Sequence, residues 1–156
     1  MSTLLGIAIK PRKRAALLEV AVAELSTARG LVGDCRGKPG PRQVTLLTHA
    51  NWRAACAEVG VELPWTTRRA NLLVDDLALI ESVGTHIQLG DAVLEITGET
   101  DPCVRMDAAQ PGLFAALKPD WRGGVCCRVV QGGRLMLGMA VTLAPLALRR
   151  ESRPED

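Results

Sequence analysis

Short apolar runs, each broken after a few residues by glycine, proline or aspartate, constrain the fold of this chain more than any other feature. Runs of this length that are rich in β-branched or alternating apolar residues are typical of strands. Several such strands in succession favour a sheet that curls on itself. We therefore expect a mainly β fold, a closed or partly open β-barrel with two or three short helices. The predicted strands lie within 3–10, 17–25, 43–48, 68–74, 86–97, 124–130 and 134–139.

Two segments have a helical pattern instead. Apolar residues recur at helical spacing between 52 and 59, and Gly60 follows them as a stop signal. The hydroxyl of Thr48 is placed to cap the first turn of this helix. Pro111 begins a second, shorter helix over 111–118, at the position that tolerates a missing N–H.

Glycines predict how the strands connect. Gly132 and Gly133 separate two strand-like runs, which predicts a hairpin because glycine accepts the positive φ of a tight turn. The segments 89–93 and 137–141 read LGDAV and LGMAV. We interpret this echo as two equivalent strands, each bent at its glycine.

Composition excludes several classes of function. The chain has 156 residues with 19 basic and 17 acidic side chains, a net charge of +2 that is too small for a general nucleic-acid binder. It has no Tyr and one Phe, so base stacking on aromatic side chains is not expected. No apolar run reaches the ~18 residues of a membrane span, and the N-terminus lacks the order of a secretory signal. We expect a cytoplasmic protein with neither a nucleic acid nor a membrane as partner.

The cysteines and histidines do not form a standard metal motif. Five cysteines cannot all pair, and no CxxC occurs. The histidines, His49 and His86, are isolated. Neither GxGxxG nor GxxxxGK[ST] occurs, which removes the common nucleotide-binding loops.

Cys103 is the first candidate for chemistry. It lies in TGETDPCVRMD, in a turn set by Asp101 and Pro102 after a predicted strand. Arg105 follows two residues later and would favour the thiolate, the form that attacks and binds metal. The alternative is a buried thiol that serves as a small apolar residue. We interpret Cys56, Cys126 and Cys127 in this structural way, and the role of Cys35 in the long loop stays open.

Basic residues beside predicted strand ends are the second candidate. These positions can converge at one end of a barrel, and Arg forks suit phosphate because they donate two parallel hydrogen bonds. Asn71 shares its strand face with Arg69 and offers donors and an acceptor to a heterocycle. The alternative for each residue alone is a solvated surface charge. The basic candidates are Lys10, Arg36, Arg42, Arg68 and Arg69.

Five segments in order resemble a small standalone MOSC domain, the family named for the C-terminal domain of molybdenum-cofactor sulfurases. They are GIAIKP, GLVGDCRGKPGPRQVTLL, TTRRANLLV, LGDAVLEITGETDPCVRM and GGVCCRVVQGGRLMLG. The resemblance implies a MOSC domain over 3–145, with a barrel of the PK-like type. Residues 146–156 are polar, and from this composition we expect a disordered tail. Gly138-Met139 departs from the family, which usually has Gly-Asp there.

The same resemblance implies a site. Cys103 occupies the position of the cysteine that carries sulfur as a persulfide or ligates molybdenum. Lys10, Arg36, Arg69 and Asn71 match the residues that hold a molybdopterin cofactor, and we add Arg68. No site for pyridoxal phosphate is expected in this chain.

Three functions follow as alternatives. The first is a molybdenum-cofactor binding protein that carries sulfur or ligates molybdenum through Cys103, with a separate sulfurase as partner. The second is a molybdenum-dependent reductase of N-hydroxylated compounds that takes electrons from a separate protein. The third is a non-catalytic barrel that binds some other anion.

Overall fold

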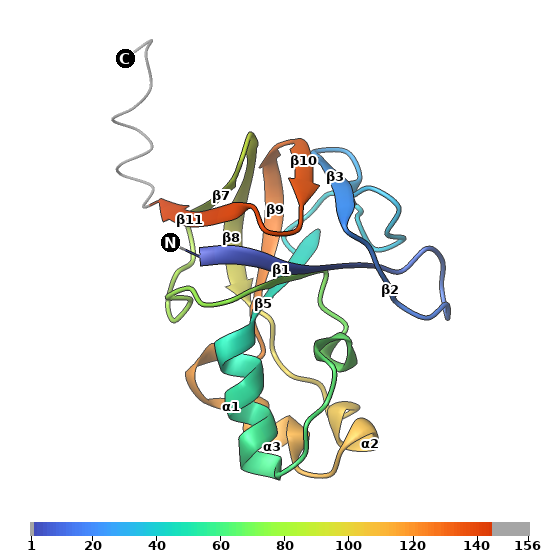
Figure 1. The fold of residues 1–156 in the computed structure, drawn as a ribbon, viewed down its shortest axis with the longest axis vertical. Coiled ribbons are helices and arrows are strands. Elements are labelled where there is room, and N and C mark those ends of the chain that lie inside the picture. The colour runs from blue at the N-terminus through green and yellow to red at the C-terminus, as the bar shows by residue number, and fades with distance from the viewer. Residues whose placement is uncertain (1, 145–156) are drawn as a thin grey trace.

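A computed structural model describes residues 2–144, and in it seven strands close into a barrel (Figure 1). Around the barrel the order is β11-β7-β8-β9-β5-β6-β1, and β1 pairs with β11 to complete the circle. Only β5 and β6 are a parallel pair among the described strands. The barrel strands are β1 (Ser2–Ile9), β5 (Val44–Thr48), β6 (Leu72–Val74), β7 (His86–Leu89), β8 (Ala92–Glu99), β9 (Val125–Gln131) and β11 (Ala140–Ala144).

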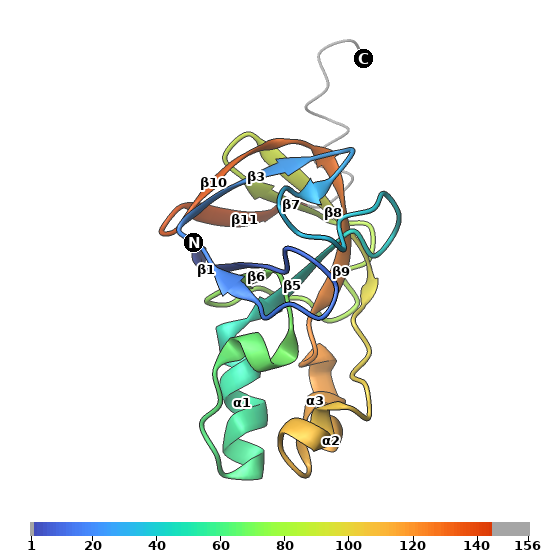
Figure 2. The same ribbon diagram turned by 90° about the vertical axis from the view of Figure 1, so that its right-hand side faces the viewer.

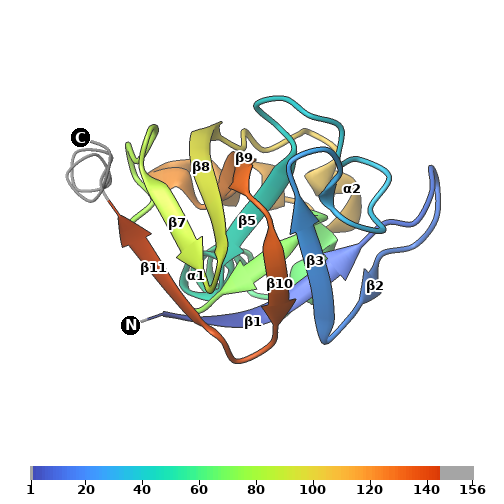
Figure 3. The same ribbon diagram turned by 90° about the horizontal axis from the view of Figure 1, so that it is seen from above.

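A smaller sheet lies across one side of the barrel. It consists of β10 (Gly133–Met136), β3 (Val22–Ser26) and β4 (Gly30–Leu31), and Figure 3 shows β10 and β3 side by side. The two-residue strand β2 (Leu18–Glu19) pairs with the end of β1.

The helices gather below one end of the barrel, as Figure 2 shows. Thr48 caps α1 as predicted, since its hydroxyl accepts a hydrogen bond from the Asn51 N–H at 3.1 Å. Gly60 ends α1 with a φ of 75°, in the left-handed region that glycine adopts at low cost. The helical elements are α1 (His49–Val59), η1 (Trp65–Arg68), α2 (Met106–Ala109), α3 (Leu113–Leu117) and η2 (Pro119–Trp121).

Two apolar cores follow from the alternation of side chains along the strands. Leu46 of β5 points into the barrel with Ile87 and Leu94, whereas the next residue, Leu47, packs outward against Trp52 of α1. The outer core therefore fastens the helices to the β5–β6 face of the barrel. None of the helices within residues 2–144 has the length and hydropathy that crossing a bilayer requires.

The structure corrects several sequence-based expectations about connections. The single strand predicted over 17–25 is two strands, because the chain leaves β1 after Glu19 and joins β10 from Val22 onward. The run 68–74 begins with the last residue of η1, and only Leu72–Val74 is strand. The predicted tail, 146–156, lies outside the described residues.

The hairpin predicted at Gly132-Gly133 is wrong. β9 pairs with β5 and β8, while β10 pairs with β3, so the two glycines mark a corner between sheets. A Cβ at Gly132 would lie 2.6 Å from the Leu25 carbonyl oxygen, and one at Gly133 would lie 2.8 Å from the Ala92 nitrogen. Close approach of backbones requires these glycines.

The similarity between LGDAV and LGMAV also does not reflect two bent strands, as the sequence predicted. Gly90 joins β7 to β8, and Gly138 lies between β10 and β11, so both glycines lie in turns rather than inside bent strands. Both have a positive φ, 61° and 89°, which explains why each copy has glycine there.

Candidate functional site

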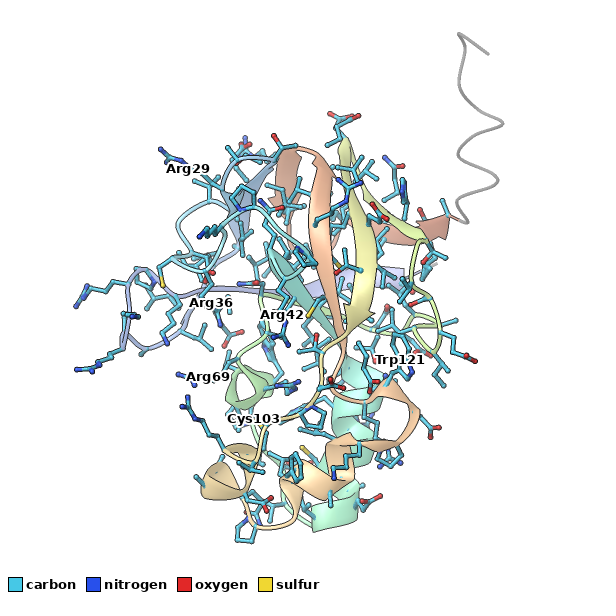
Figure 4. All side chains as sticks on the ribbon, turned by 180° about the vertical axis from the view of Figure 1, so that it is seen from behind. Arg29, Arg36, Arg42, Arg69, Cys103 and Trp121 are labelled. Atoms are coloured by element: carbon cyan, nitrogen blue, oxygen red, sulfur yellow. The ribbon has the colours of Figure 1, made fainter. Side chains whose placement is uncertain are left out.

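A cavity of about 240 Å³ opens between the end of the barrel and the helices. Its walls come from the glycine-rich loop before β5, from η1 and the start of β6, and from the segment that follows β8. In Figure 4, Arg36, Arg42, Arg69 and Cys103 lie around this region, while Arg29 lies apart from it. The lining residues are Arg36, Arg42, Gln43, Thr45, Arg68, Arg69, Ala70, Asn71, Thr100, Cys103, Arg105, Met106 and Gly123. We call this cavity the arginine pocket.

Cys103 lines the arginine pocket with an exposed thiol. It lies in the turn between β8 and α2, and its carbonyl oxygen accepts a hydrogen bond from the Met106 N–H at 2.9 Å. The alternative of a buried structural thiol therefore does not apply to Cys103. Cys35 is also exposed, but it lines a separate depression beside Arg29 and Lys38.

Arg68 is buried and holds the backbone around Cys103. Its Nε donates to the Gly123 carbonyl at 3.2 Å, and its Nη2 donates to the carbonyls of Thr100 at 3.0 Å and Asp101 at 3.4 Å. Burial lowers the pKa of Arg68, but a guanidinium stays charged at neutral pH. Arg68 thus places a positive charge in the pocket wall while it fixes the turn that leads to Cys103.

Asp34 holds Arg36 at the pocket. Its carboxylate side chain is 1% exposed and accepts from Nη2 of Arg36 at 3.0 Å and from Nε at 3.1 Å. A bidentate pair of this kind fixes the guanidinium plane. The remaining Nη1 donates to the Arg69 carbonyl at 2.9 Å, so the glycine-rich loop is fastened to the residue that follows η1.

Arg69 lines the pocket with an exposed side chain and an unusual backbone. Its φ is 67°, in the left-handed region that non-glycine residues seldom occupy. This conformation turns the chain out of η1 and into β6. Unlike the guanidinium groups of Arg36 and Arg68, that of Arg69 makes no hydrogen bond within the described residues, and Figure 4 places the residue near Cys103.

Asn71 reaches the pocket wall, and its amide also joins three strands. Its Oδ1 accepts from the Thr45 N–H at 3.1 Å, and its Nδ2 donates to the Ala8 carbonyl at 3.3 Å. The amide therefore positions β1, β5 and β6 relative to one another. Its orientation in the pocket is set by the fold.

Lys10 contributes to the site through its backbone. Its N–H donates to Asp34 Oδ1 at 2.6 Å, and its carbonyl accepts from the Cys35 N–H. The lining of the arginine pocket does not include Lys10 within the described residues. The structure thus brings together Cys103, Arg36, Arg68, Arg69 and Asn71, and places Lys10 behind Asp34.

Eight lining residues were not among the predicted site residues: Arg42, Gln43, Thr45, Ala70, Thr100, Arg105, Met106 and Gly123. Three of them concern the charge of the pocket or the Cys103 turn. Arg42 follows the prolines of the long loop, and Arg105 follows Cys103 by two residues. Thr100 precedes the Cys103 turn, and its Oγ1 lies 3.3 Å from Cys126 Sγ. Arg42 is one of the basic candidates beside predicted strand ends, but the family resemblance did not assign it to the cofactor.

The pocket is strongly cationic. Five arginines line it, and no acidic residue does so in the described part of the chain. Asp34 offsets the charge of Arg36 from behind. The guanidinium groups of Arg42, Arg68, Arg69 and Arg105 form no salt bridge within the described residues, although Asp101 lies within electrostatic range of Arg42 and Arg68. The pocket therefore keeps an excess of positive charge beside an accessible thiol.

A sequence profile of the MOSC domain matches residues 33–142. The chain belongs to the MOSC domain family. MOSC domains are associated with binding of the molybdenum cofactor. A search of curated proteins finds no match to this MOSC domain.

Solved structures share the fold of this MOSC domain. The YUAD protein from Bacillus subtilis superimposes with a TM-score of 0.76 at 19% identity, over 93% of this chain and 97% of that one. YiiM from Geobacillus stearothermophilus gives a TM-score of 0.72 at 16% identity, over 97% and 83% of the two chains. YiiM from Escherichia coli gives 0.66 at 15%, over 91% and 69%.

Proposed function

We propose that this MOSC domain binds a molybdopterin cofactor in the arginine pocket and uses the Cys103 thiolate to carry sulfur to it or to ligate its molybdenum. One observation supports this most directly: an exposed thiol shares a cavity with five arginines, of which only Arg36 forms a salt bridge within the described residues. A soft thiolate suits both sulfur and molybdenum, and guanidinium groups suit the phosphate of the pterin.

The residues fit such a ligand by their chemistry. Arg69 and Arg105 are exposed at the pocket and are free to donate bidentate hydrogen bonds to a phosphate. Arg36 is held in place by Asp34 and adds its outer N–H groups to the same wall. A bound cofactor would supply molybdenum with its dithiolene sulfurs, the group that performs electron or sulfur chemistry.

The protein's own part is to bind, position and stabilise charge. Arg68 holds the Thr100 and Asp101 carbonyls, and so fixes where the Cys103 turn begins. Arg68 and Arg105 line the same pocket as Cys103, so their positive charge is available to offset negative charge on a bound ligand. In the carrier role, a separate sulfurase provides the sulfane sulfur that Cys103 holds.

Metal and pterin analysis of protein purified from a host that makes the cofactor tests the proposal. Wild-type protein should copurify with molybdenum and pterin, and Cys103→Ser should lose either the metal or a persulfide adduct. Cys35→Ser is the matched control, because Cys35 is equally exposed but lies outside the arginine pocket. Equal metal, pterin and persulfide in wild type and Cys103→Ser would refute the role of Cys103.

A second pair of variants tests the pocket. Arg69→Ala should weaken binding of the pterin phosphate, by about tenfold for one lost charged contact. Arg29→Ala removes the same charge from a site away from the arginine pocket, and should bind the cofactor as wild type does. Equal losses in both variants would indicate a general charge effect and would contradict binding in this pocket.

A further inference from the structure

Two adjacent cysteines of β9 lie in opposite environments. Cys127 points into the barrel core, where burial raises the pKa of its thiol. Cys126 points the other way, and its residue is 4% exposed. Neighbouring residues of a strand face opposite sides, so one of this pair belongs to the core and the other to the side of the arginine pocket.

The Cys126 side chain lies beside residues that line the arginine pocket. Its Sγ lies 3.3 Å from Thr100 Oγ1. Cys126 also lies close enough to the Arg42 guanidinium to raise the pKa of Arg42. Arg68 lies within electrostatic range of both Cys126 and Cys103. The pocket therefore has a second sulfur directly behind its wall.

The backbone between Thr100 and Cys103 limits how far the Cys103 sulfur can lie from the Cys126 sulfur. Thr100 contacts Cys126, and Cys103 follows Thr100 by three residues, which span at most ~11 Å when fully extended. Arg68 fixes the carbonyls at 100 and 101, whereas Cys103, Val104 and Arg105 are exposed. Movement that brings Cys103 toward Cys126 is thus confined to the few residues after Asp101.

We propose that Cys126 is a second functional thiol of the arginine pocket, which resolves a persulfide on Cys103 and releases its outer sulfur as hydrosulfide. This inference rests on the proposed function, because it requires sulfane sulfur on Cys103. It gives this site a way to discharge sulfur when no acceptor is bound.

The step balances without an outside oxidant. The Cys126 thiolate attacks Cys103 Sγ, and a Cys103–Cys126 disulfide forms as the bond to the outer sulfur breaks. The outer sulfur leaves with the bonding electron pair as hydrosulfide, and solvent takes the proton from the Cys126 thiol. The outer sulfur is reduced and the Cys126 sulfur is oxidised, while the Cys103 sulfur exchanges one sulfur partner for another without a change in oxidation state. A small thiol or a dithiol reductant then restores both cysteines for another cycle.

Arg42 and Thr100 position Cys126 for this attack. The Thr100 hydroxyl contacts the sulfur from the end of the strand that leads to Cys103, and Arg42 lies near the sulfur on the side of the glycine-rich loop. Guanidinium groups on this wall also offset negative charge on the attacking sulfur.

The test loads the reduced full-length protein with inorganic polysulfide and then removes the excess. Mass spectrometry follows a gain of about 32 Da on the Cys103 peptide, and a colorimetric assay follows released sulfide. Wild type and Cys127→Ser should each release about one equivalent of sulfide per persulfide, and Cys126→Ser should keep the adduct and release sulfide at least about tenfold more slowly.

Cys127→Ser also identifies the linkage. Trypsin cuts after Arg122 and Arg128, so the peptide 123–128 of this variant holds one cysteine, Cys126. A disulfide between this peptide and the Cys103 peptide, formed as sulfide is released, would support the inference. Its absence, or equal sulfide release from wild type and Cys126→Ser, would overturn it.

The two proposals fail in different ways. If no variant gains sulfur on Cys103, the carrier role falls and the second thiol has nothing to resolve. If Cys103 gains sulfur but Cys126→Ser behaves as wild type, only the inference about Cys126 falls. Cys126→Ala replaces Cys126→Ser if the serine variant does not fold, as judged by circular dichroism.

Discussion

The barrel interior and the arginine pocket are adjacent, but the interior consists of apolar side chains and the pocket of charged and polar ones. Inside the barrel, side chains such as Leu46, Ile87 and Leu94 pack against one another without a charged group among the core residues described. At the barrel's end, guanidinium groups bind backbone carbonyls and a buried carboxylate. The interior resists unfolding by removing apolar surface from water, whereas the pocket is held by directional bonds that also leave charge available to a ligand.

The largest effect is expected from the interior. Leu94 is fully buried, so Leu94→Ala leaves a cavity and should lower the free energy of unfolding by about 2–5 kcal/mol. Urea unfolding measures this loss. Val104→Ala is the control, because Val104 is 68% exposed, and its effect should stay within about 0.5 kcal/mol. Equal losses in the two variants would break the distinction between interior and surface.

Arg68→Met should have the next largest effect, and it tests the directional bonds of the pocket. The change leaves the carbonyls of Thr100, Asp101 and Gly123 without their shared donor, at a cost of about 2–3 kcal/mol. Thiol-labelling kinetics should show a changed rate at Cys103, because its turn loses the anchor.

Arg128→Met is the matched control for Arg68→Met. Arg128 is half exposed and pairs with Glu95 on the barrel surface, so its loss should cost less than about 1 kcal/mol. An Arg68→Met protein as stable as Arg128→Met would show that the buried guanidinium does not hold the pocket together.

A smaller effect is expected at Arg69, where the backbone itself is unusual. Arg69→Gly and Arg69→Ala both remove the guanidinium, but only glycine adopts a φ of 67° at low cost. The glycine variant should be more stable than the alanine variant by about 1 kcal/mol in urea unfolding. The two should lose phosphate binding equally. Equal stability would mean that this turn carries no backbone cost.

The smallest effect is expected at Asp75, which directly follows β6 and accepts a hydrogen bond from Thr3 of β1. Hydrogen bonds from the backbone N–H of Thr3 and of Asp76 lower the pKa of this carboxyl group. A depressed folded pKa gives stability that is present above the unfolded value of about 3.9 and is lost as pH falls through the folded value. Asp75→Asn should therefore be slightly less stable at pH 6, and the gap should close toward pH 3. Urea midpoints across this range measure it, and a gap independent of pH would contradict the assignment.

Local signals predicted local structure. Thr48 and Gly60 bound α1 as the sequence indicates, because a cap hydroxyl and a left-handed stop act within one turn of the helix. The hairpin predicted at Gly132 and Gly133 was wrong, because these glycines are required by close contacts with Leu25 and Ala92, which are far away in sequence. No pattern within a few residues reports such a close approach.

In the site, too, the sequence predicted local features but not contacts between distant parts of the chain. A turn position and a family resemblance were enough to select Cys103, which lines the pocket. They could not show that Arg68 binds carbonyls more than thirty residues away along the chain, because those bonds exist only once β8 and β9 are paired. The sequence also could not show that Lys10, unlike the other basic candidates, does not line the pocket. Its place depends on the hydrogen bond from its backbone N–H to Asp34, which is 24 residues away along the chain.

The parallel pairing of β5 and β6 has a consequence for how this site can vary. Strands that run in the same direction cannot be joined by a tight turn, so the chain makes a long excursion between them. That excursion contains α1 and η1 and returns through Arg68 and Arg69. Within this excursion the residues that line the arginine pocket are Arg68, Arg69, Ala70 and Asn71, directly before β6. The excursion is therefore the natural place to re-engineer ligand preference on this scaffold.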